Sequence, residues 1–302
     1  MSGTRDFSAG AAWIEGEFVP IAEARVPVTD WGFLRSDATY DVAHVWQGRF
    51  FRLDDHVARF LRGVEKLRMS LPVGEAGLRA ILHRCVALAG LKDAYVEMIC
   101  TRGQPPPGSR DPRLCRNAFF AFAVPFVWIC DPEAQKTGLS LRVSDVVRIP
   151  PSSVDPTVKN YHWHDLTRGI FDACDHGDAS AVLTDGHGNV TEGPGFNVFS
   201  VRGGALATPD AGVLEGITRR SAIELAREAG RRVEERPVSA DELRRADEVF
   251  ATSTAGGIMP VTRIDGAPVG AGVPGPVTMA LRARYWAAHA DPRWSEPVRA
   301  GT

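Results

Sequence analysis

Apolar residues in the first fifty positions are grouped as short strands separated by glycine-containing turns. Two pairs of apolar stretches flank such turns: 12–14 with 17–20 around Gly16, and 39–46 with 49–53 around Gln47-Gly48. Paired runs of β-branched and aromatic residues around a turn of this kind are typical of β-hairpins. The pattern therefore predicts that the chain begins with two hairpins.

From Asp54 onward, the apolar residues take the spacing of helices. Positions 57, 60, 61, 64 and 67 are apolar and follow Asp54 and Asp55, either of which is a candidate N-cap. A second set runs from Leu78 to Leu88 and ends just before Gly90. Both sets predict amphipathic helices, and we expect the two helices to cover one face of the sheet.

The middle of the chain predicts two longer strands, at 94–102 and 118–129, joined by the proline-rich loop 103–113. Proline has no N–H to donate to a central strand, so this loop must lie outside the sheet. A polar stretch follows at 131–138. We interpret it as a linker between a first domain at 1–130 and a second domain at 139–302.

Strands and helices in the second half do not alternate strictly. The pattern predicts strands at 139–147, 181–184, 197–201, 205–208 and 248–252, and helices at 163–174, 218–229 and 276–289. Strict alternation of strand and helix would indicate a doubly wound parallel sheet, whereas this mixture favours an α+β fold. The sequence therefore predicts two α+β domains.

Composition narrows the class of partner. The 302 residues are 44% apolar and carry a formal net charge of −2 with interspersed acids and bases, which is no electrostatic footprint for nucleic acid or anionic lipid. The five cysteines are scattered without metal-ligand spacing, so we expect reduced thiols and no metal site. No apolar run is long enough for a signal sequence or a membrane span. We therefore expect a cytoplasmic protein that acts on small molecules.

Two residues are candidates for cofactor chemistry. Lys159 lies in the segment Thr157-Val158-Lys159-Asn160, and Glu192 precedes a glycine-rich turn about thirty residues later. A lysine whose charge is disfavoured by burial can form a Schiff base, and a carboxylate can keep a pyridine nitrogen protonated. Together they point to pyridoxal 5′-phosphate (PLP). Taken singly, each has a plainer interpretation, as an ordinary surface lysine and a turn glutamate.

Three groups of residues offer donors for the phosphate of this cofactor. Gly216-Ile217-Thr218 begins a predicted helix, whose first N–H groups and dipole attract an anion. The segment 252–257 combines hydroxyls with glycines that let the backbone curve around an anion. Arg59 would add a charged donor. The alternatives are a plain helix cap at Thr218 and a solvated side chain at Arg59.

The order of these motifs resembles a known family. Leu-Asp-Asp-His-Val-Ala-Arg at 53–59, Val-Lys-Asn at 158–160, Thr-Glu-Gly-Pro-Gly-Phe-Asn at 191–197 and Thr-Ala-Gly-Gly at 254–257 resemble the fold-type IV PLP enzymes, which include branched-chain and D-amino acid aminotransferases. The resemblance covers roughly residues 10 to 290 and implies a smaller N-terminal α/β domain and a larger, β-rich C-terminal domain with helices. Within the family, positions 11–16, 51–56 and 256–261 are most similar to the (R)-selective amine transaminases.

The resemblance implies a role for each motif residue. Lys159 would form the imine with the cofactor and carry the proton, Glu192 would bind the pyridine nitrogen, and Leu214 would pack on the ring. The implied phosphate contacts are Arg59, Ile217, Thr218 and Thr254. The implied substrate pocket is lined by Tyr40, Val42, Tyr95 and Trp163, with Ala255 on the side of the small substituent.

Three positions bear on how closely the resemblance applies. Pro194 stands where family members usually have a small residue, and it would stiffen or shift the backbone beside Glu192. Arg35 stands where the (R)-amine transaminases usually have histidine; it would bind a substrate carboxylate and favour D-amino acids, or else point to solvent or pair with Asp37. Arg110 resembles a mobile arginine that binds the keto acid, the alternative being a solvated loop residue.

The predicted function is the transfer of an amino group from a chiral (R)-amine to a keto acid such as pyruvate, by a ping-pong mechanism through the imine at Lys159. The alternatives are a D-amino acid or branched-chain amino acid aminotransferase and, from another class, a lyase of the aminodeoxychorismate type. The resemblance also implies a homodimer.

Overall fold

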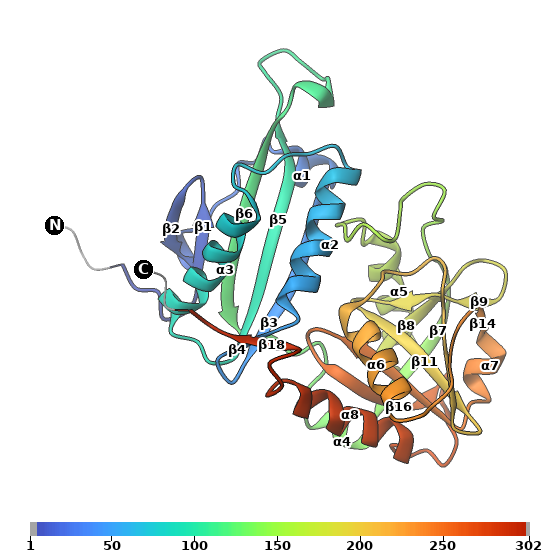
Figure 1. Cartoon of the computed structure of the whole chain (residues 1–302). Coiled ribbons are helices and arrows are strands. Elements are labelled where there is room, and N and C mark those ends of the chain that lie inside the picture. Colours follow the sequence, from blue (N-terminus) through green and yellow to red (C-terminus); the bar gives the residue numbers. More distant parts are fainter. Residues whose placement is uncertain (1–4, 300–302) are drawn as a thin grey trace. The chain divides into compact units, whose positions relative to one another are not determined.

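The computed structural model describes residues 5–299, which pack into two compact units (Figure 1). The first unit comprises residues 5–127, the short segment Val158–Tyr161 and residues 289–299. The second comprises Trp128–Thr157 and His162–Ala288. Within the described residues, no helix is long and apolar enough to cross a membrane.

This division differs from the expected one, in which everything after residue 138 formed one domain. Two later segments return to the first unit. The carbonyl of Lys159 accepts hydrogen bonds from Thr39 and from the Tyr40 N–H, and β18 (Ser295–Pro297) pairs with β4 (Arg49–Phe51). The expected linker at 131–138 contains a short helix, α4 (Ala134–Thr137). Pairing over such distances leaves no trace in a local pattern, which is why the sequence did not predict it.

The first unit is an antiparallel sheet with helices on one face. Its strands run in the order β18-β4-β3-β5-β6-β1-β2. The elements are β1 (Ala11–Ile14), β2 (Glu17–Pro20), η1 (Ile21–Glu23), α1 (Trp31–Arg35), β3 (Ala38–Trp46), β4 (Arg49–Phe51), α2 (Leu53–Lys66), α3 (Glu75–Ala89), β5 (Ala94–Gln104), η2 (Pro112–Leu114), β6 (Arg116–Pro125) and β18 (Ser295–Pro297). Both predicted hairpins and both predicted helices are present.

Helices α2 and α3 pack on this sheet through the apolar positions that the sequence predicted (Figure 1). Phe60 of α2 and Leu82 of α3 are almost fully buried against it. The predicted N-cap is wrong, because α2 begins at Leu53 and its N-cap is Arg52, in the left-handed conformation at φ 50°. Asp54 and Asp55 occupy the first turn instead, where carboxylates stabilise the helix dipole.

The second unit is built on a mixed sheet in the order β13-β12-β11-β15-β16-β7-β8-β9-β14. Its elements are α4, β7 (Leu139–Val147), α5 (His164–Asp175), β8 (Ser180–Thr184), β9 (Asn189–Val190), β10 (Glu192–Gly193), β11 (Phe196–Arg202), β12 (Ala205–Thr208), α6 (Ile217–Glu228), β13 (Val233–Glu235), β14 (Val238–Ser239), α7 (Ala240–Arg244), β15 (Glu248–Ser253), β16 (Gly257–Ile264), β17 (Ala267–Pro268) and α8 (Pro276–Ala288). Helix α5 packs on β7 and β8, and α6 contacts α8 (Figure 1). The pairs β16–β7, β7–β8 and β12–β13 are parallel and the others antiparallel, so the α+β prediction is confirmed.

Strand β16 was not predicted. All but one of its residues are buried, so it shows no alternation between apolar and polar positions. A strand of this kind cannot be recognised by a period of two.

Candidate active site

Lys159 lies beside strand β3 of the first unit. Its carbonyl accepts hydrogen bonds from Thr39 Oγ1 at 2.9 Å and from the Tyr40 N–H at 3.1 Å. The side chain is half-buried, and Nζ lies 4.6 Å from the centroid of the Tyr40 ring. Backbone pairing and the aromatic face therefore hold this amine in one place, unlike that of a solvated surface lysine.

A buried carboxylate lies in the same cluster. Tyr40 stacks on Tyr161 with ring centroids 4.3 Å apart, and the Tyr161 hydroxyl donates to Glu97 Oε1 at 2.7 Å. Burial raises the pKa of Glu97, while hydrogen bonds from Tyr161 and Tyr95 and the charge of Lys159 oppose the rise. Burial and the nearby Glu97 in turn raise the pKa values of Tyr95 and Tyr161, so both tyrosines remain hydrogen-bond donors.

Arg59 is held by a second buried carboxylate of the first unit. Its Nε donates to Asp41 Oδ2 at 2.7 Å and its Nη2 to Asp41 Oδ1 at 2.9 Å, and His56 Nδ1 lies 2.8 Å from Asp41 Oδ1. Although burial opposes it, the charge of Arg59 and the contacts with His56 lower the pKa of Asp41. Arg59 is therefore a buried, oriented cation, and the solvated alternative is wrong.

The remaining candidates of the first unit differ in exposure. Val42 is buried on β3, whereas Arg110 is exposed in the loop between β5 and β6. The Arg35 guanidinium lies 3.3 Å from the centroid of the Trp31 ring, in the same short helix α1. Asp37 accepts two hydrogen bonds from Arg102.

Glu192 is a buried carboxylate in the second unit. Its Oε1 accepts from Nε and Nη2 of Arg148, both at 3.2 Å, and its Oε2 accepts from the Leu214 N–H at 2.9 Å. Arg148 also donates from Nη1 to Asp165 Oδ2 at 2.7 Å. Burial lowers the pKa of Arg148, but the two carboxylates raise it by more. The turn-glutamate alternative describes its location, yet its contacts are those of an oriented, charged group.

The backbone beside Glu192 accommodates Pro194 without distortion. Strands β10 and β11 are joined by the two-residue turn Pro194-Gly195, and the pairing of Glu192 with Asn197 is regular. Gly195 has φ +82°. Proline followed by a glycine with positive φ suits the central positions of a type II turn.

Glu192, Asn197 and Thr252 lie in one row across β10, β11 and β15, because each is the register partner of the next. Directly opposed residues share one face of an antiparallel sheet. Asn197 Nδ2 donates to the Leu214 carbonyl at 3.0 Å, so Leu214 is held at both its N–H and its carbonyl. Thr252 Oγ1 is buried without a hydrogen-bond partner among the described residues.

The N-terminus of α6 lies next to this row. Gly216 is its N-cap and provides no side-chain cap, and a Cβ on Gly216 would come within 2.1 Å of Asn197 Oδ1. The uncapped N–H groups of Ile217 and Thr218 begin the helix, so the plain-cap alternative for Thr218 is wrong. Thr218 Oγ1 lies 3.5 Å from the Tyr285 hydroxyl.

Three further candidates occupy turns of the second unit. Thr254 and Ala255 form the turn between β15 and β16, where the Ala255 carbonyl accepts from the Ile129 N–H at 2.8 Å. Trp163 is the N-cap residue of α5. A Cβ on Gly195 would lie 3.6 Å from its ring.

Sequence reasoning missed Glu97, Tyr161, Arg148 and Asp165. The Tyr161–Glu97 and Arg148–Glu192 contacts join residues 64 and 44 positions apart. The one local signal, at Glu97 and Arg148, is a charged residue inside or just after an apolar strand, which is too common to identify a site.

The described residues include groups of the kinds that PLP requires. Lys159 would provide an amine for its aldehyde, Glu192 a buried carboxylate for the pyridine N–H, and the uncapped end of α6 N–H donors for its phosphate.

Comparison with known proteins identifies the family. Residues 38–264 match the family described as amino-transferase class IV. The chain is 32% identical to a putative branched-chain-amino-acid aminotransferase of Methanocaldococcus jannaschii, covering 90% of this chain and 94% of that protein. It is 30% identical to a D-alanine aminotransferase of Bacillus licheniformis, covering 87% and 91%.

Solved structures with a similar fold are also aminotransferases. The branched-chain amino acid aminotransferase of Thermobaculum terrenum in its PLP form has a TM-score of 0.86 and 28% identity, covering 97% of this chain and 100% of that one. The Escherichia coli branched-chain enzyme has a TM-score of 0.88 and 26% identity, covering 96% and 99%. The chain therefore belongs to the class IV aminotransferases and is a PLP-dependent transaminase of fold type IV.

Proposed function

We propose that this transaminase takes its amino group from a chiral (R)-amine and gives it to a keto acid such as pyruvate. The observation that carries the proposal is Glu97, a buried carboxylate close enough to Lys159 for the charge of the lysine to lower the pKa of the carboxyl group. An amino acid donor brings a carboxylate to the reacting carbon, whereas an amine brings none. A fixed carboxylate in the same cluster therefore discriminates against amino acids.

The expected discrimination follows from Coulomb's law. Two carboxylates about 5 Å apart repel by about 3 kcal/mol at an effective dielectric constant of about 20, which corresponds to roughly two orders of magnitude in kcat/KM. The oxygens of Glu97 accept hydrogen bonds from Tyr161 and Tyr95, and an ionised carboxylate has no proton to donate to a substrate carboxylate. Arg35 rests on Trp31 in its own helix, which supports the same preference.

In this proposal each candidate residue has a separate role in the reaction. Bound PLP supplies an electron sink for the charge that develops when the donor carbon loses its proton. The ε-amine of Lys159 removes that proton and returns it, and Glu192 holds the proton on the pyridine nitrogen. Leu214 packs on the ring.

The phosphate and the substrate are bound by the other candidates. Arg59, Ile217, Thr218 and Thr254 bind the phosphate. The donor's substituents are seated by Tyr40, Val42, Tyr95, Trp163 and Ala255. Arg110 binds the carboxylate of the keto acid, which must enter for the second half-reaction.

The experiment compares donors for the wild type and for Glu97→Gln. We expect the wild type to convert (R)-1-phenylethylamine with pyruvate, and to use the (S)-enantiomer, D-alanine and L-leucine poorly. Glu97→Gln should raise kcat/KM for D-alanine relative to the (R)-amine by roughly tenfold to a hundredfold. The control is Glu65→Gln, at an exposed position of α2.

Two results would overturn the proposal. A wild type that prefers D-alanine or L-leucine would establish the alternative, an amino acid aminotransferase of the kind named in the relatives. Turnover without any keto acid would indicate a lyase. We also propose a cytoplasmic homodimer, and light scattering of the purified protein tests its dimeric state.

A further inference from the structure

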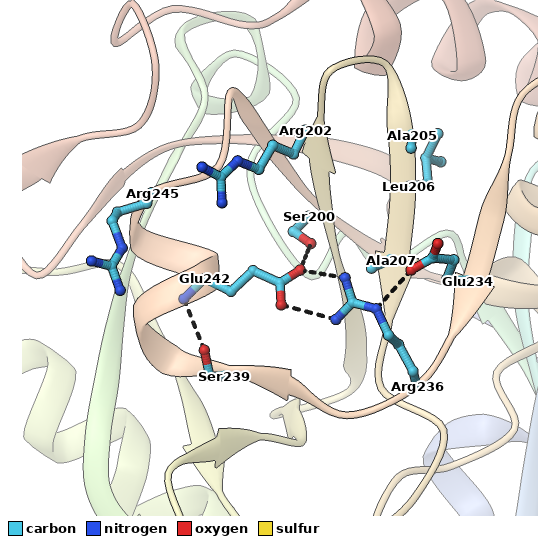
Figure 2. Close-up of a pocket in the computed structure, with 10 residues that line it drawn as sticks. All are labelled: Ser200, Arg202, Ala205, Leu206, Ala207, Glu234, Arg236, Ser239, Glu242 and Arg245. Carbon is cyan, nitrogen blue, oxygen red and sulfur yellow. Dashed lines mark hydrogen bonds and ion pairs between the residues drawn. The ribbon is translucent and has the colours of Figure 1, made fainter.

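A cavity of about 510 Å³ opens in the second unit (Figure 2). It is lined by Ser200, Arg202, Ala205, Leu206, Ala207, Glu234, Arg236, Ser239, Glu242 and Arg245, none of which has a role in the proposed reaction. Small-molecule sites in proteins are typically about 300–1,000 Å³. The size is therefore that of a site for a small metabolite rather than for a single ion.

Small side chains on one face of two paired strands create the space. Ser200 of β11 is the register partner of Ala207 of β12, and Arg202 is the partner of Ala205, so these four side chains share a face. Three of the four are alanine or serine. Short side chains of a regular β-ladder therefore form one side of the cavity, its floor.

An ion-pair network forms a fixed wall. Arg236 donates from Nη1 and Nη2 to both oxygens of Glu242, at 2.9 and 2.8 Å, and from Nε to Glu234 at 2.8 Å (Figure 2). Ser239 accepts the Glu242 N–H as the N-cap of α7, and Ser200 donates to Glu242 Oε1 at 3.3 Å. Hydrogen bonds from Arg236 lower the pKa values of Glu234 and Glu242. Both carboxylates are therefore ionised and already matched by a cation.

Arg202 is a cation of the cavity lining that takes no part in this ion-pair network. Its side chain forms no hydrogen bond or ion pair with the residues that the structure describes, and it acts on Glu242 only through its charge. Arg245, on the same side of Glu242 as Arg202 in Figure 2, pairs with the exposed Asp241. Of the three arginines that line the cavity, Arg236 pairs with both glutamates and Arg245 with Asp241, so the Arg202 side chain is the one left available to a ligand.

We propose that this cavity binds a small organic anion, a carboxylate or a phosphate ester, at a site separate from the transamination chemistry. Arg202 binds the anionic group, because a guanidinium presents paired donors that match a carboxylate or phosphate. The body of the ligand lies on the floor formed by Ala205 and Ala207. The hydroxyls of Ser200 and Ser239 lie within the same lining.

The test is calorimetric titration of the PLP-loaded enzyme with two probes, succinate and glycerol 3-phosphate. Neither has an amino or keto group, so binding is measured without turnover and independently of the donor specificity. We expect saturable 1:1 binding of at least one probe, and the stronger of the two identifies the anion class. Raising the salt concentration should weaken it.

Two variants and one control locate the binding. Arg202→Ala should weaken it roughly tenfold or more by removing the charged donors. Ala205→Leu should weaken it to a similar degree by filling the floor, with all charges retained. Arg263→Ala removes an exposed arginine elsewhere in the same sheet and should leave affinity unchanged.

Specific outcomes overturn the proposal. If neither probe shows saturable binding, the proposal is overturned. Binding that all three variants leave unchanged shows a different location. Binding that Arg202→Ala weakens while Ala205→Leu does not shows an ordinary surface ion pair and no cavity site.

Discussion

Replacing Arg148 by glutamine tests how the second unit keeps Glu192 charged. Arg148 is the cation between two buried carboxylates, 3.2 Å from Glu192 and 2.7 Å from Asp165, and all three side chains are at most 10% exposed. The cluster therefore has one positive and two negative charges. Arg148→Gln retains polar donors but leaves two buried carboxylates without a cation.

The magnitude follows from burial and distance. Removing one partner of a buried ion pair costs roughly 3–5 kcal/mol, because the other charge stays buried and unpaired. At roughly 2–4 °C per kcal/mol for a domain of about 150 residues, the unfolding midpoint should fall by roughly 6–20 °C. Arg148 donates two hydrogen bonds to Glu192 Oε1, so its loss should also leave less firmly oriented the carboxylate that is proposed to hold the proton on the pyridine nitrogen. The kcat/KM for transamination should therefore fall.

The assay combines thermal unfolding with kcat/KM measurements for Arg148→Gln, Asp165→Asn and the double variant. The double variant restores the wild-type net charge of the cluster, so it should recover at least half of the lost stability. If the double variant is no more stable than Arg148→Gln, loss of packing and not of charge explains the effect. An unchanged kcat/KM in Arg148→Gln would refute the role assigned to this arginine.

Three other predictions address different parts of the chain. Lys159→Ala should abolish transamination and the covalent attachment of PLP, checked by borohydride trapping; residual attachment at another lysine would contradict the assignment. Leu82→Ala should lower the free energy of unfolding by roughly 2–5 kcal/mol, measured by urea denaturation, because Leu82 of α3 is fully buried against the sheet, whereas a loss below about 1 kcal/mol would contradict this packing. Burial and neighbouring His289 hold the pKa of His44 well below 6.5, and burial lowers that of His56 although Asp41 opposes the shift, so both bind protons less readily in the folded chain than in the unfolded one. Stability should therefore fall as pH drops below about 6.5, by up to about 1.4 kcal/mol per pH unit for each histidine, and a flat urea midpoint from pH 7.5 to 5.5 would refute this.

The local pattern of apolar and polar residues was sufficient to predict the helices and strands that bury one face. The helices α2, α3 and α6 and the strand β7 were predicted within a few residues, since their apolar spacing repeats with the period of the element itself. The strand β16, which is buried almost throughout, was not predicted, although β15, which is buried along its whole length, was. The start of α2 was also misjudged, because Arg52 adopts the left-handed conformation that sequence rules assign to few residues.

The motif residues themselves were recognisable because short segments carry them in order along the chain. Lys159 and Glu192 could be proposed as a cofactor pair from Val-Lys-Asn and from the glycine-rich turn, and the family comparison supports the chemistry. Pro194 could not be assessed in this way. Its fit depends on the φ of +82° at Gly195, which is a property of the folded turn.

The partners of those residues required the folded chain. Glu97 meets Tyr161 across 64 positions, and Arg148 meets Glu192 across 44, at distances where sequence spacing carries no information about contact. The cavity beside Arg202 likewise exists because β11, β12 and the segment before α7 converge. Short-range periodicity therefore indicates which elements form, and the ordered motifs indicate which residues are candidates for the chemistry. The charges and cavities around those residues arise only when packing brings distant segments together, because electrostatic and hydrogen-bond energies depend on distance in space and not along the chain.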